Sequence, residues 1–378
     1  MLTTTYLALT LCGLVGQADL GSNADGEAER AMVLTSNLLI EIDTSRPEEL
    51  VAVTGIDGLG DGETVLAIDY RPTTGALYGV TSEHRVCLID PDSGDVEFIG
   101  EGAYPIASDR EAIEIAFEPQ TDQLRVVGGQ SGRNVRIDVD TAEFFVDDEL
   151  TVADDPGLMT RSVGLGYALE SATGSATAYV LSYDPDSGRT RLGTLGSAGG
   201  TPEKPNSGRI HFVADLDGVD GASASAIDVA DDSRSAFVSV NEGSGPELVR
   251  IDLDTQTTTR LGAILDHSIG DVQGIAIQAR EGKRFVRGDV DGDGAYRSLL
   301  DAVTLLQAAF NGQELPCRDA ADADDDGEVS GLTDALFILL HGFGGGPSPS
   351  APFPTCGTDP DGDRDGVDCA RSAVGCEQ

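Results

Sequence analysis

The feature that most constrains this chain is a phrase that occurs five times between residues 31 and 278. Each copy has an apolar segment that ends in Asp, a short polar turn and a second apolar segment. Successive copies are 47, 48, 46 and 68 residues apart by subtraction; their acids are Asp43, Asp90, Asp138, Asp184 and Asp252. Short strands repeated with a period in the forties are typical of β-propeller blades.

A second repeated phrase supplies two more strands to each blade. The segments "VLAIDYRPTTGALYGVTS" (65–82) and "AIEIAFEPQTDQLRVVGG" (112–129) align turn for turn, 224–241 is a third copy, and 162–180 is a degraded fourth. The strand "VQGIAIQ" (272–278) stands alone, and the first Asp phrase lacks an inner strand. We therefore expect the last strand to complete the first blade, since closure leaves no open sheet edge. The prediction is a mainly β chain with a propeller over residues 28–279, five blades being favoured and six the alternative.

Two local features of the repeats have simple interpretations. The Asp of each phrase precedes a short turn, where its carboxylate can accept backbone N–H groups, and this favours a turn role over metal binding or catalysis. The long fourth interval contains "SAGGTPEKPNSGRI" (197–210), which we interpret as an exposed loop insertion.

The repeat region resembles a known bacterial family, the domain of unknown function numbered 4394. The resemblance rests on "IDYRPTTGALYGVTS" (68–82), "AFEPQTDQLRVVGGQSGRNVRID" (116–138) and "LVRIDLDT", and it covers about residues 30–278. It implies an exported propeller-like module and supplies no activity and no catalytic residues.

The composition changes after residue 285, where an acidic loop followed by an apolar segment occurs twice. An offset of 33 residues places Asp289 on Asp322, Gly294 on Gly327 and Asp301 on Asp334. Carboxylates at loop positions one, three and five, with glycine at six, are the arrangement that wraps a calcium ion in six to eight oxygens. Each loop should be followed by a helix, in which Val303, Leu306 and Phe310, or Leu336, Leu339, Leu340 and Phe343, share one face.

The spacing therefore predicts two Ca²⁺ sites. A carbonyl at position seven and a later acid complete the expected shell. The candidate ligands of the first loop are Asp289, Asp291, Asp293, the carbonyl of Ala295 and Asp301. Those of the second are Asp322, Asp324, Asp326, the carbonyl of Glu328, Ser330 and Asp334.

The duplicated loop and helix resemble a type I dockerin, an EF-hand-like module, and more narrowly the form found at the end of exported planctomycete proteins. The resemblance covers roughly residues 285–376, with a dockerin-like domain at 285–345. It implies two bound Ca²⁺ ions and docking onto a cohesin-like receptor or a cell-surface polysaccharide or protein. The sequence departs from the pattern in one respect: the closing acids Asp301 and Asp334 stand at position thirteen instead of twelve. Arg297 at position nine cannot bind a cation, whereas Ser330 can, so the second loop has the better shell.

The last segment, 346–378, is a Pro- and Cys-rich tail. The Pro-rich segment 344–354, which begins just before this tail, is expected to be a semi-rigid spacer. A third acidic run (359–369) is expected to be a solvated loop. Four late cysteines suggest two disulfides in an exported protein, with three pairings open: Cys317, Cys356, Cys369 and Cys376. The solitary Cys87 is expected to be buried in a strand. An apolar N-terminal run followed by small residues predicts a signal peptide over 1–18, and no later segment has the length of a membrane span.

The net charge of −42, from 66 acidic and 24 basic residues, disfavours nucleic acid and anionic membranes as partners. The four histidines are scattered, and neither a metalloprotease motif nor a nucleophile elbow is present. We therefore expect an exported, non-enzymatic protein in which a propeller presents a binding surface and a Ca²⁺-dependent module docks it. The alternatives are a carbohydrate-active hydrolase carried on the propeller and a structural surface or matrix protein bridged by Ca²⁺.

Overall fold

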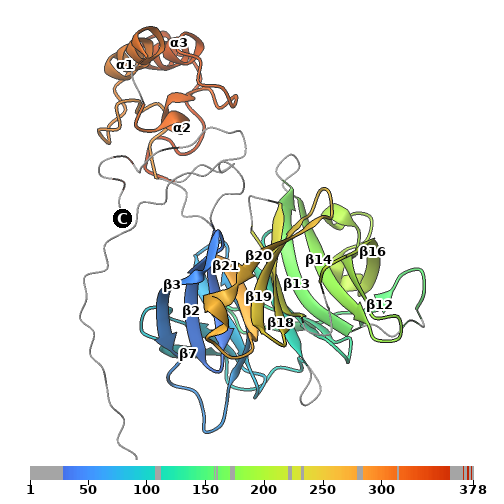
Figure 1. The fold of residues 1–378 in the computed structure, drawn as a ribbon. Helices are drawn as coiled ribbons and strands as arrows, with labels where there is room; N and C mark the ends of the chain where they lie inside the picture. Colours follow the sequence, from blue (N-terminus) through green and yellow to red (C-terminus); the bar gives the residue numbers. More distant parts are fainter. Residues whose placement is uncertain are drawn as a thin grey trace, which may run out of the picture.

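The computed structural model describes residues 29–376, except 107–111, 157, 159–160, 171–174, 220–223, 231–233, 279–283, 313–314, 358–368, 370–372 and 374–375. Residues 29–278 form five sheets around a central axis, and a smaller helical unit follows (Figure 1). The predicted signal peptide and all of the third acidic run except Cys369 lie outside the described residues.

Each sheet is one blade, so the mainly β propeller with five blades is confirmed. The innermost strands are β21 (Gly274–Gln278), β4 (Val65–Arg71), β8 (Ile113–Glu118), β13 (Arg161–Glu170) and β17 (Ala224–Val229). Each contacts the next around the ring, and β21 contacts both β4 and β17. The last strand thus closes the ring as the sequence predicts, because it pairs with β1 (Arg30–Thr35) of the first blade.

The outer strands follow in chain order in four of the blades. The first blade adds β2 (Leu38–Asp43) and β3 (Arg46–Gly55). The second adds β5 (Ala76–Thr81), β6 (Val86–Ile89) and β7 (Val96–Ile99). The third adds β9 (Gln123–Gly128), β10 (Asn134–Ile137) and β11 (Phe144–Val146). The fifth adds β18 (Ser235–Glu242), β19 (Gly245–Asp252) and β20 (Thr258–Ala263).

The fourth blade differs from the expected pattern. Its second strand, β14 (Ser175–Asp184), contains the first half of the Asp phrase, and β15 (Arg189–Leu195) is only the third strand. The fourth strand, β16 (Arg209–Asp215), lies beyond the insertion, and β12 (Thr151–Val152) pairs parallel to it as a fifth. The segment 197–210 is therefore an insertion within the blade. It holds two short 3₁₀ turns, Ala198–Gly200 and Pro205–Ser207, and Pro205 and Gly208 are buried.

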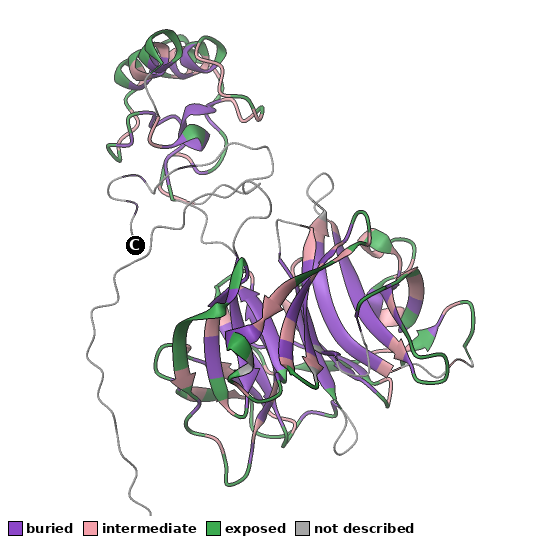
Figure 2. Cartoon of the chain, in the orientation of Figure 1, coloured by how far each residue is buried: buried purple, intermediate pink, exposed green. Residues whose placement is uncertain are grey.

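The apolar cores lie between the blades, and Figure 2 shows that the strands are buried mainly toward the inside of the ring. One buried cluster occupies each of the five boundaries between neighbouring blades. The inner strands are apolar on both faces because each face meets a neighbouring sheet. Glycine permits close approach between inner strands: a Cβ at Gly164 would lie 2.0 Å from Cγ2 of Ile227 in the next blade. Cys87 is buried and unpaired, as expected.

The C-terminal unit contains α1 (Ser298–Asn311), α2 (Arg318–Ala321), α3 (Thr333–Leu339) and a π-helical turn, η4 (Leu340–Gly344). Helices α1 and α3 contact each other, and each follows one acidic loop. Their shared core is made of small and medium residues: Val290, Ala302, Leu305, Ala321, Ala323, Ala335 and Ile338.

The tail packs against this unit. Cys317 is bonded to Cys369, and Cys356 to Cys376, which selects one of the three open pairings. The buried Arg287 donates its backbone N–H to the Pro352 carbonyl at 2.7 Å and its Nε–H to the Ala351 carbonyl at 3.1 Å. The ring of Phe353 meets that of Tyr296 edge to face. The Pro-rich segment is therefore not the spacer that the sequence predicts, because its own residues are part of the folded unit.

Candidate functional site

The first acidic loop brings three of its predicted ligands together. Asp289, Asp291 and Asp293 each place a carboxylate oxygen within 4.8 Å of the others. Asp289 is fully buried, and its Oδ2 accepts the N–H of Gly294 at 2.8 Å. Its Oδ1 is also buried and has no hydrogen-bond partner within the described structure. A buried carboxylate oxygen without a partner is costly unless a cation neutralises it.

The second loop repeats this geometry. Oxygens of Asp322, Asp324 and Asp326 lie within 4.8 Å of one another, and Asp322 Oδ2 accepts the N–H of Gly327 at 2.9 Å. In this loop the unpartnered oxygen is Oδ1 of Asp324, which is buried and receives no hydrogen bond from the described residues. The glycines at position six have φ values of 86° and 82°, which residues with a side chain rarely adopt. Each glycine turns the chain sharply, and Ala295 or Glu328 follows it at position seven.

The predicted closing acids have a different role in the structure. Asp301 and Asp334 lie in the first turns of α1 and α3, both buried. Asp301 accepts N–H groups from Val290 at 2.9 Å and Arg297 at 2.5 Å. Asp334 accepts the equivalent groups of Ala323 at 2.9 Å and Ser330 at 2.7 Å. Each carboxylate thus fixes its loop through backbone amides, and its direct contact with an ion stays a prediction.

Burial dominates the electrostatics of both loops. It raises the pKa of Asp289, Asp322 and Asp324 above the ordinary value, and the neighbouring acids add to the effect. It raises the pKa of Asp301 and that of Asp334 to about 6. A raised pKa means that an acid resists ionisation, so these neighbouring acids do not readily carry their negative charges at the same time. A hard divalent cation removes this penalty and prefers oxygen ligands, so the residues present fit Ca²⁺.

The two loops differ at position nine, and this changes the surroundings of the Asp at position five. The Arg297 guanidinium pairs with the carboxylate of Asp293 in the first loop. The corresponding residues of the second loop are Ser330 and Asp326, and the Ser330 backbone N–H bonds Asp334. A cation entering the first loop therefore competes with Arg297 for Asp293. Arg287 lies near the second loop, where it pairs with Asp325 at 2.8 Å and donates to the backbone carbonyl of Asp322 at 3.0 Å. Its charge acts to lower the pKa of Asp322, but it has no ion pair with the carboxylate of Asp326 among the described residues.

The face that apolar periodicity predicts for each helix is mostly outward in the structure. Phe310 and Phe343 are 79% and 73% exposed, although apolar periodicity places them on one face with Val303 or Leu336. The buried face of α1 carries Ala302, Leu305 and Ala308 instead. We call those exposed apolar residues that occur at equivalent positions in both repeats the apolar face. It consists of three pairs related by the offset of 33: Leu299 with Leu332, Val303 with Leu336, and Phe310 with Phe343.

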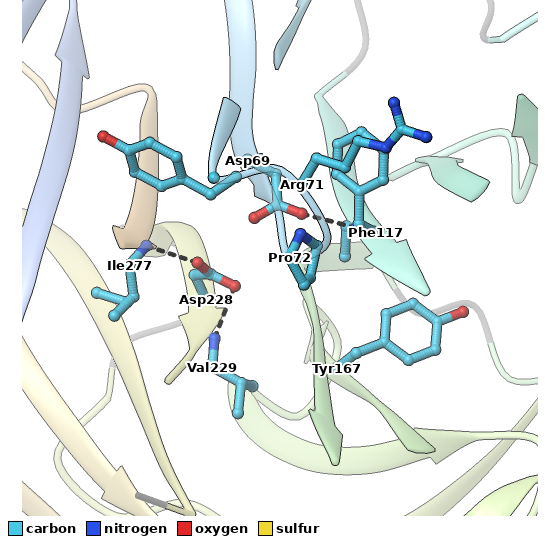
Figure 3. Close-up of a pocket in the computed structure, with 11 residues that line it drawn as sticks. Asp69, Arg71, Pro72, Phe117, Tyr167, Asp228, Val229 and Ile277 are labelled. Carbon is cyan, nitrogen blue, oxygen red and sulfur yellow. Dashed lines mark hydrogen bonds between the residues drawn. The ribbon is translucent and has the colours of Figure 1, made fainter. Parts of the chain in front are cut away.

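One end of the propeller's central channel carries two aspartates, and each accepts a backbone N–H from a neighbouring blade (Figure 3). Asp69 on β4 accepts the N–H of Phe117 on β8 at 2.7 Å. Asp228 on β17 accepts the N–H of Ile277 on β21 at 2.6 Å and that of Val229 at 2.7 Å. The space between them is only about 20 Å³, enough for about one water molecule. This end of the channel is therefore a packed junction.

The repeated aspartates behave as turn residues. Asp90, Asp138, Asp184 and Asp252 each accept, on Oδ1, the N–H groups two and three positions later. Asp43 accepts the N–H and hydroxyl of Ser45. The predicted turn role is confirmed, since these bonds close the loop after each strand.

Comparison with known proteins places the propeller in a described family. The family "Domain of unknown function (DUF4394)" matches residues 38–276, so the acidic loops and helices lie outside the match. No curated protein matches the chain. In the described part of the chain, no helix has the length and apolar character to cross a membrane.

Several solved structures share parts of the fold at low identity. A chain of a nidogen/laminin complex is 10% identical with a TM-score of 0.43, over 66% of this chain and 98% of that one. TolB from Acinetobacter baumannii is 14% identical with a TM-score of 0.37, over 67% of each chain. The Dos1 propeller is 13% identical with a TM-score of 0.34, over 64% of this chain and 56% of the other. At these scores the likeness says nothing of function.

Proposed function

The chain belongs to the DUF4394 family, and from this premise we propose that it is an exported calcium-binding protein, in which the family's propeller is joined to a dockerin-like module. The module binds two Ca²⁺ ions, one in each acidic loop, and docks the propeller onto a receptor. Two disulfides within the module support export, because such bonds persist in oxidising compartments.

One observation carries the calcium proposal: each loop gathers three carboxylates and leaves one buried oxygen, on Asp289 or Asp324, without a partner in the described chain. A turn that served only to connect elements would leave its acids in water or satisfy them with N–H groups. The backbone bonds repeat in both loops, as in Gly294 to Asp289 and Gly327 to Asp322. A common geometry built twice around acids that repel one another favours a common ion.

Titration calorimetry on the full chain, after chelator treatment, tests the calcium proposal. We expect two Ca²⁺ ions per chain and a gain in helix signal. Asp324→Asn should remove one binding event, because it replaces a buried, unpartnered oxygen of the second loop. Asp92→Asn is the matched control, since Asp92 is exposed in a propeller turn with a similar Asp-x-Asp sequence. Absence of heat in the wild-type protein contradicts the proposal.

The apolar face supports the docking role. Its residues lie on α1 and on the segment from Leu332 to Phe343, which contains α3 and most of η4 and contacts α1, and they repeat with the loops. Figure 2 shows exposed surface along both helices. Large exposed apolar residues that recur in this way are typical of protein-binding surfaces. Because calcium fixes the loop before each helix, binding through this face should depend on Ca²⁺.

Immobilised type I cohesin modules provide the probe for docking. We expect the protein to bind cohesin only with Ca²⁺ present, and the double variant Phe310→Ser, Phe343→Ser to lose this binding. The control is Leu50→Ser, a change of an exposed apolar residue on β3 of the propeller. If the double variant binds as well as the wild-type protein, the apolar face is not the docking surface. If no cohesin binds, the receptor is not of that class.

A further inference from the structure

The opposite end of the propeller channel holds a cavity of about 290 Å³. All five blades line it, at the level where the inner strands begin. Its walls are mainly apolar and include Leu66, Ile113, Val163, Ala224 and Val272. Two charged side chains, Glu114 and Arg161, also line it. A mainly apolar cavity with a few polar groups is the usual form of a small-molecule site.

Glu114 is the one long side chain at its level of the inner strands. The equivalent positions, aligned through the repeated strand phrases, are Ala67, Gly164, Ala226 and Gly274. At Gly164 even a Cβ would meet Ile227 of the next blade at 2.0 Å, so that boundary has no room for a side chain. Glu114 of the third blade, by contrast, lines the cavity together with Arg161 of the fourth blade, and it is only 6% exposed.

The polar groups of the cavity are incompletely satisfied. Nε of Arg161 is buried and has no hydrogen-bond partner among the described residues. Gln273 already uses its side-chain oxygen, which accepts the N–H of Ser36 at 2.9 Å. Burial raises the pKa of Glu114 well above its ordinary value, although the charge of Arg161 opposes this. A neutral Glu114 would supply no counter-charge to the half-buried guanidinium, whose Nε–H is then a free donor facing the described part of the cavity.

We propose that this cavity binds a small organic carboxylate. The anion accepts the Nε–H of Arg161, and the apolar part of the ligand packs against Leu66, Val163 and Val272. Glu114, when protonated, donates its O–H to the same carboxylate. The volume of about 290 Å³ lies near the lower end of the range for small-molecule pockets, so the ligand should be small. This site is independent of the acidic loops and of Ca²⁺.

Benzoate is a suitable probe, because it combines a carboxylate with a compact apolar ring. Ligand-observed NMR on the full chain, in Ca²⁺-containing buffer, should show saturable binding with a dissociation constant of about 1 mM, as expected for so small a ligand. Benzamide and benzylamine are the neutral and cationic comparisons, and both should bind at least about tenfold more weakly, since they lack the charge-assisted hydrogen bond.

Three variants assign the contact. Arg161→Met should weaken benzoate binding at least about tenfold, while Glu114→Gln, which keeps a donor, should retain it. Arg189→Met is the control, because Arg189 is exposed on β15 and does not line the cavity. If Arg161→Met does not fold, Arg161→Lys, which keeps the charge without Nε–H, takes its place. No saturable binding to the wild-type protein, equal binding of benzylamine, or unchanged affinity in the arginine variant would overturn the proposal.

Discussion

The guanidinium of Arg297 pairs with the carboxylate of Asp293, four residues earlier in the first acidic loop. The second loop has Ser330 in place of the arginine, and it repeats the backbone hydrogen bonds that the N–H groups at loop positions two, six and nine donate to the first and the closing acid. The duplicated loops are therefore unequal, although four pairs of acids and the pair of glycines occupy equivalent positions. A positive charge beside the site both occupies one ligand and repels a divalent cation.

Replacing Arg297 with Ser should make the first loop resemble the second. We expect the weaker of the two Ca²⁺ dissociation constants to fall by a few-fold, up to about tenfold, because an exposed ion pair and its repulsion are worth about 1 kcal/mol. Calorimetric titration of the full chain measures this. Arg189→Ser in the propeller is the control. An unchanged pair of constants would show that Arg297 leaves Asp293 when the ion binds.

Replacing Asp289 with Asn should have opposite effects with and without calcium. In chelator, the amide mimics the protonated acid and removes a buried charge, so the C-terminal unit should gain about 1 kcal/mol of unfolding free energy. With Ca²⁺ at about a thousand times its dissociation constant, the wild-type protein gains about 4 kcal/mol from each site, and the variant loses one such gain.

Differential scanning calorimetry in both buffers shows whether the order of the two proteins reverses. Asp92→Asn, in the propeller, should leave the order unchanged in either buffer. A wild-type protein that is the more stable of the two in chelator would contradict the idea that Asp289 is unsatisfied without an ion.

Replacing Gly164 with Ala should destabilise the propeller. The new methyl group would lie 2.0 Å from Cγ2 of Ile227, at a boundary where two inner strands meet, so one strand must shift. Overpacking of this kind costs about 1–3 kcal/mol. Urea unfolding followed by circular dichroism measures it. Gly102→Ala, where nothing lies within 4 Å of the added atom, is the control and should be nearly neutral.

Glu63 should give the propeller a specific acid sensitivity. Burial opposes its ionisation, but hydrogen bonds from Arg85, Thr81 and Gly60 hold its pKa at about 2, against 4.5 for the ordinary group. A carboxyl whose pKa is lower in the folded state stabilises the fold above the unfolded pKa. That contribution is lost as the pH falls from about 4.5 toward about 2.

The measurement is the unfolding free energy of wild type and Glu63→Gln at pH 6 and at pH 3. The difference between the two proteins should shrink by about 2 kcal/mol at the lower pH. Glu97→Gln, on the exposed side of β7, serves as the control. A constant difference would mean that the Arg85 pair contributes nothing to folding.

Patterns that are local in the chain were readable before the fold was known. The repeat period, the strand that closes the ring, the turn role of Asp90 and its equivalents, and the duplicated acidic loops all depend on residues a few positions apart or on exact repetition. Hydrogen bonds in turns and glycines at positive φ are set by such short-range geometry, so the sequence alone determined the propeller and the two loops.

Tertiary contacts decided what distant residues do together. In the fourth blade the two halves of the Asp phrase form the second and third strands, because β16, beyond the insertion, forms the fourth. Cys317 joined Cys369 because the folded tail brings residues 52 positions apart into contact. On α1, alanines were buried and Phe310 was left outside because the helices pack closely, which periodicity does not measure. The cavity beside Glu114 exists only where five inner strands meet, and no one strand contains it.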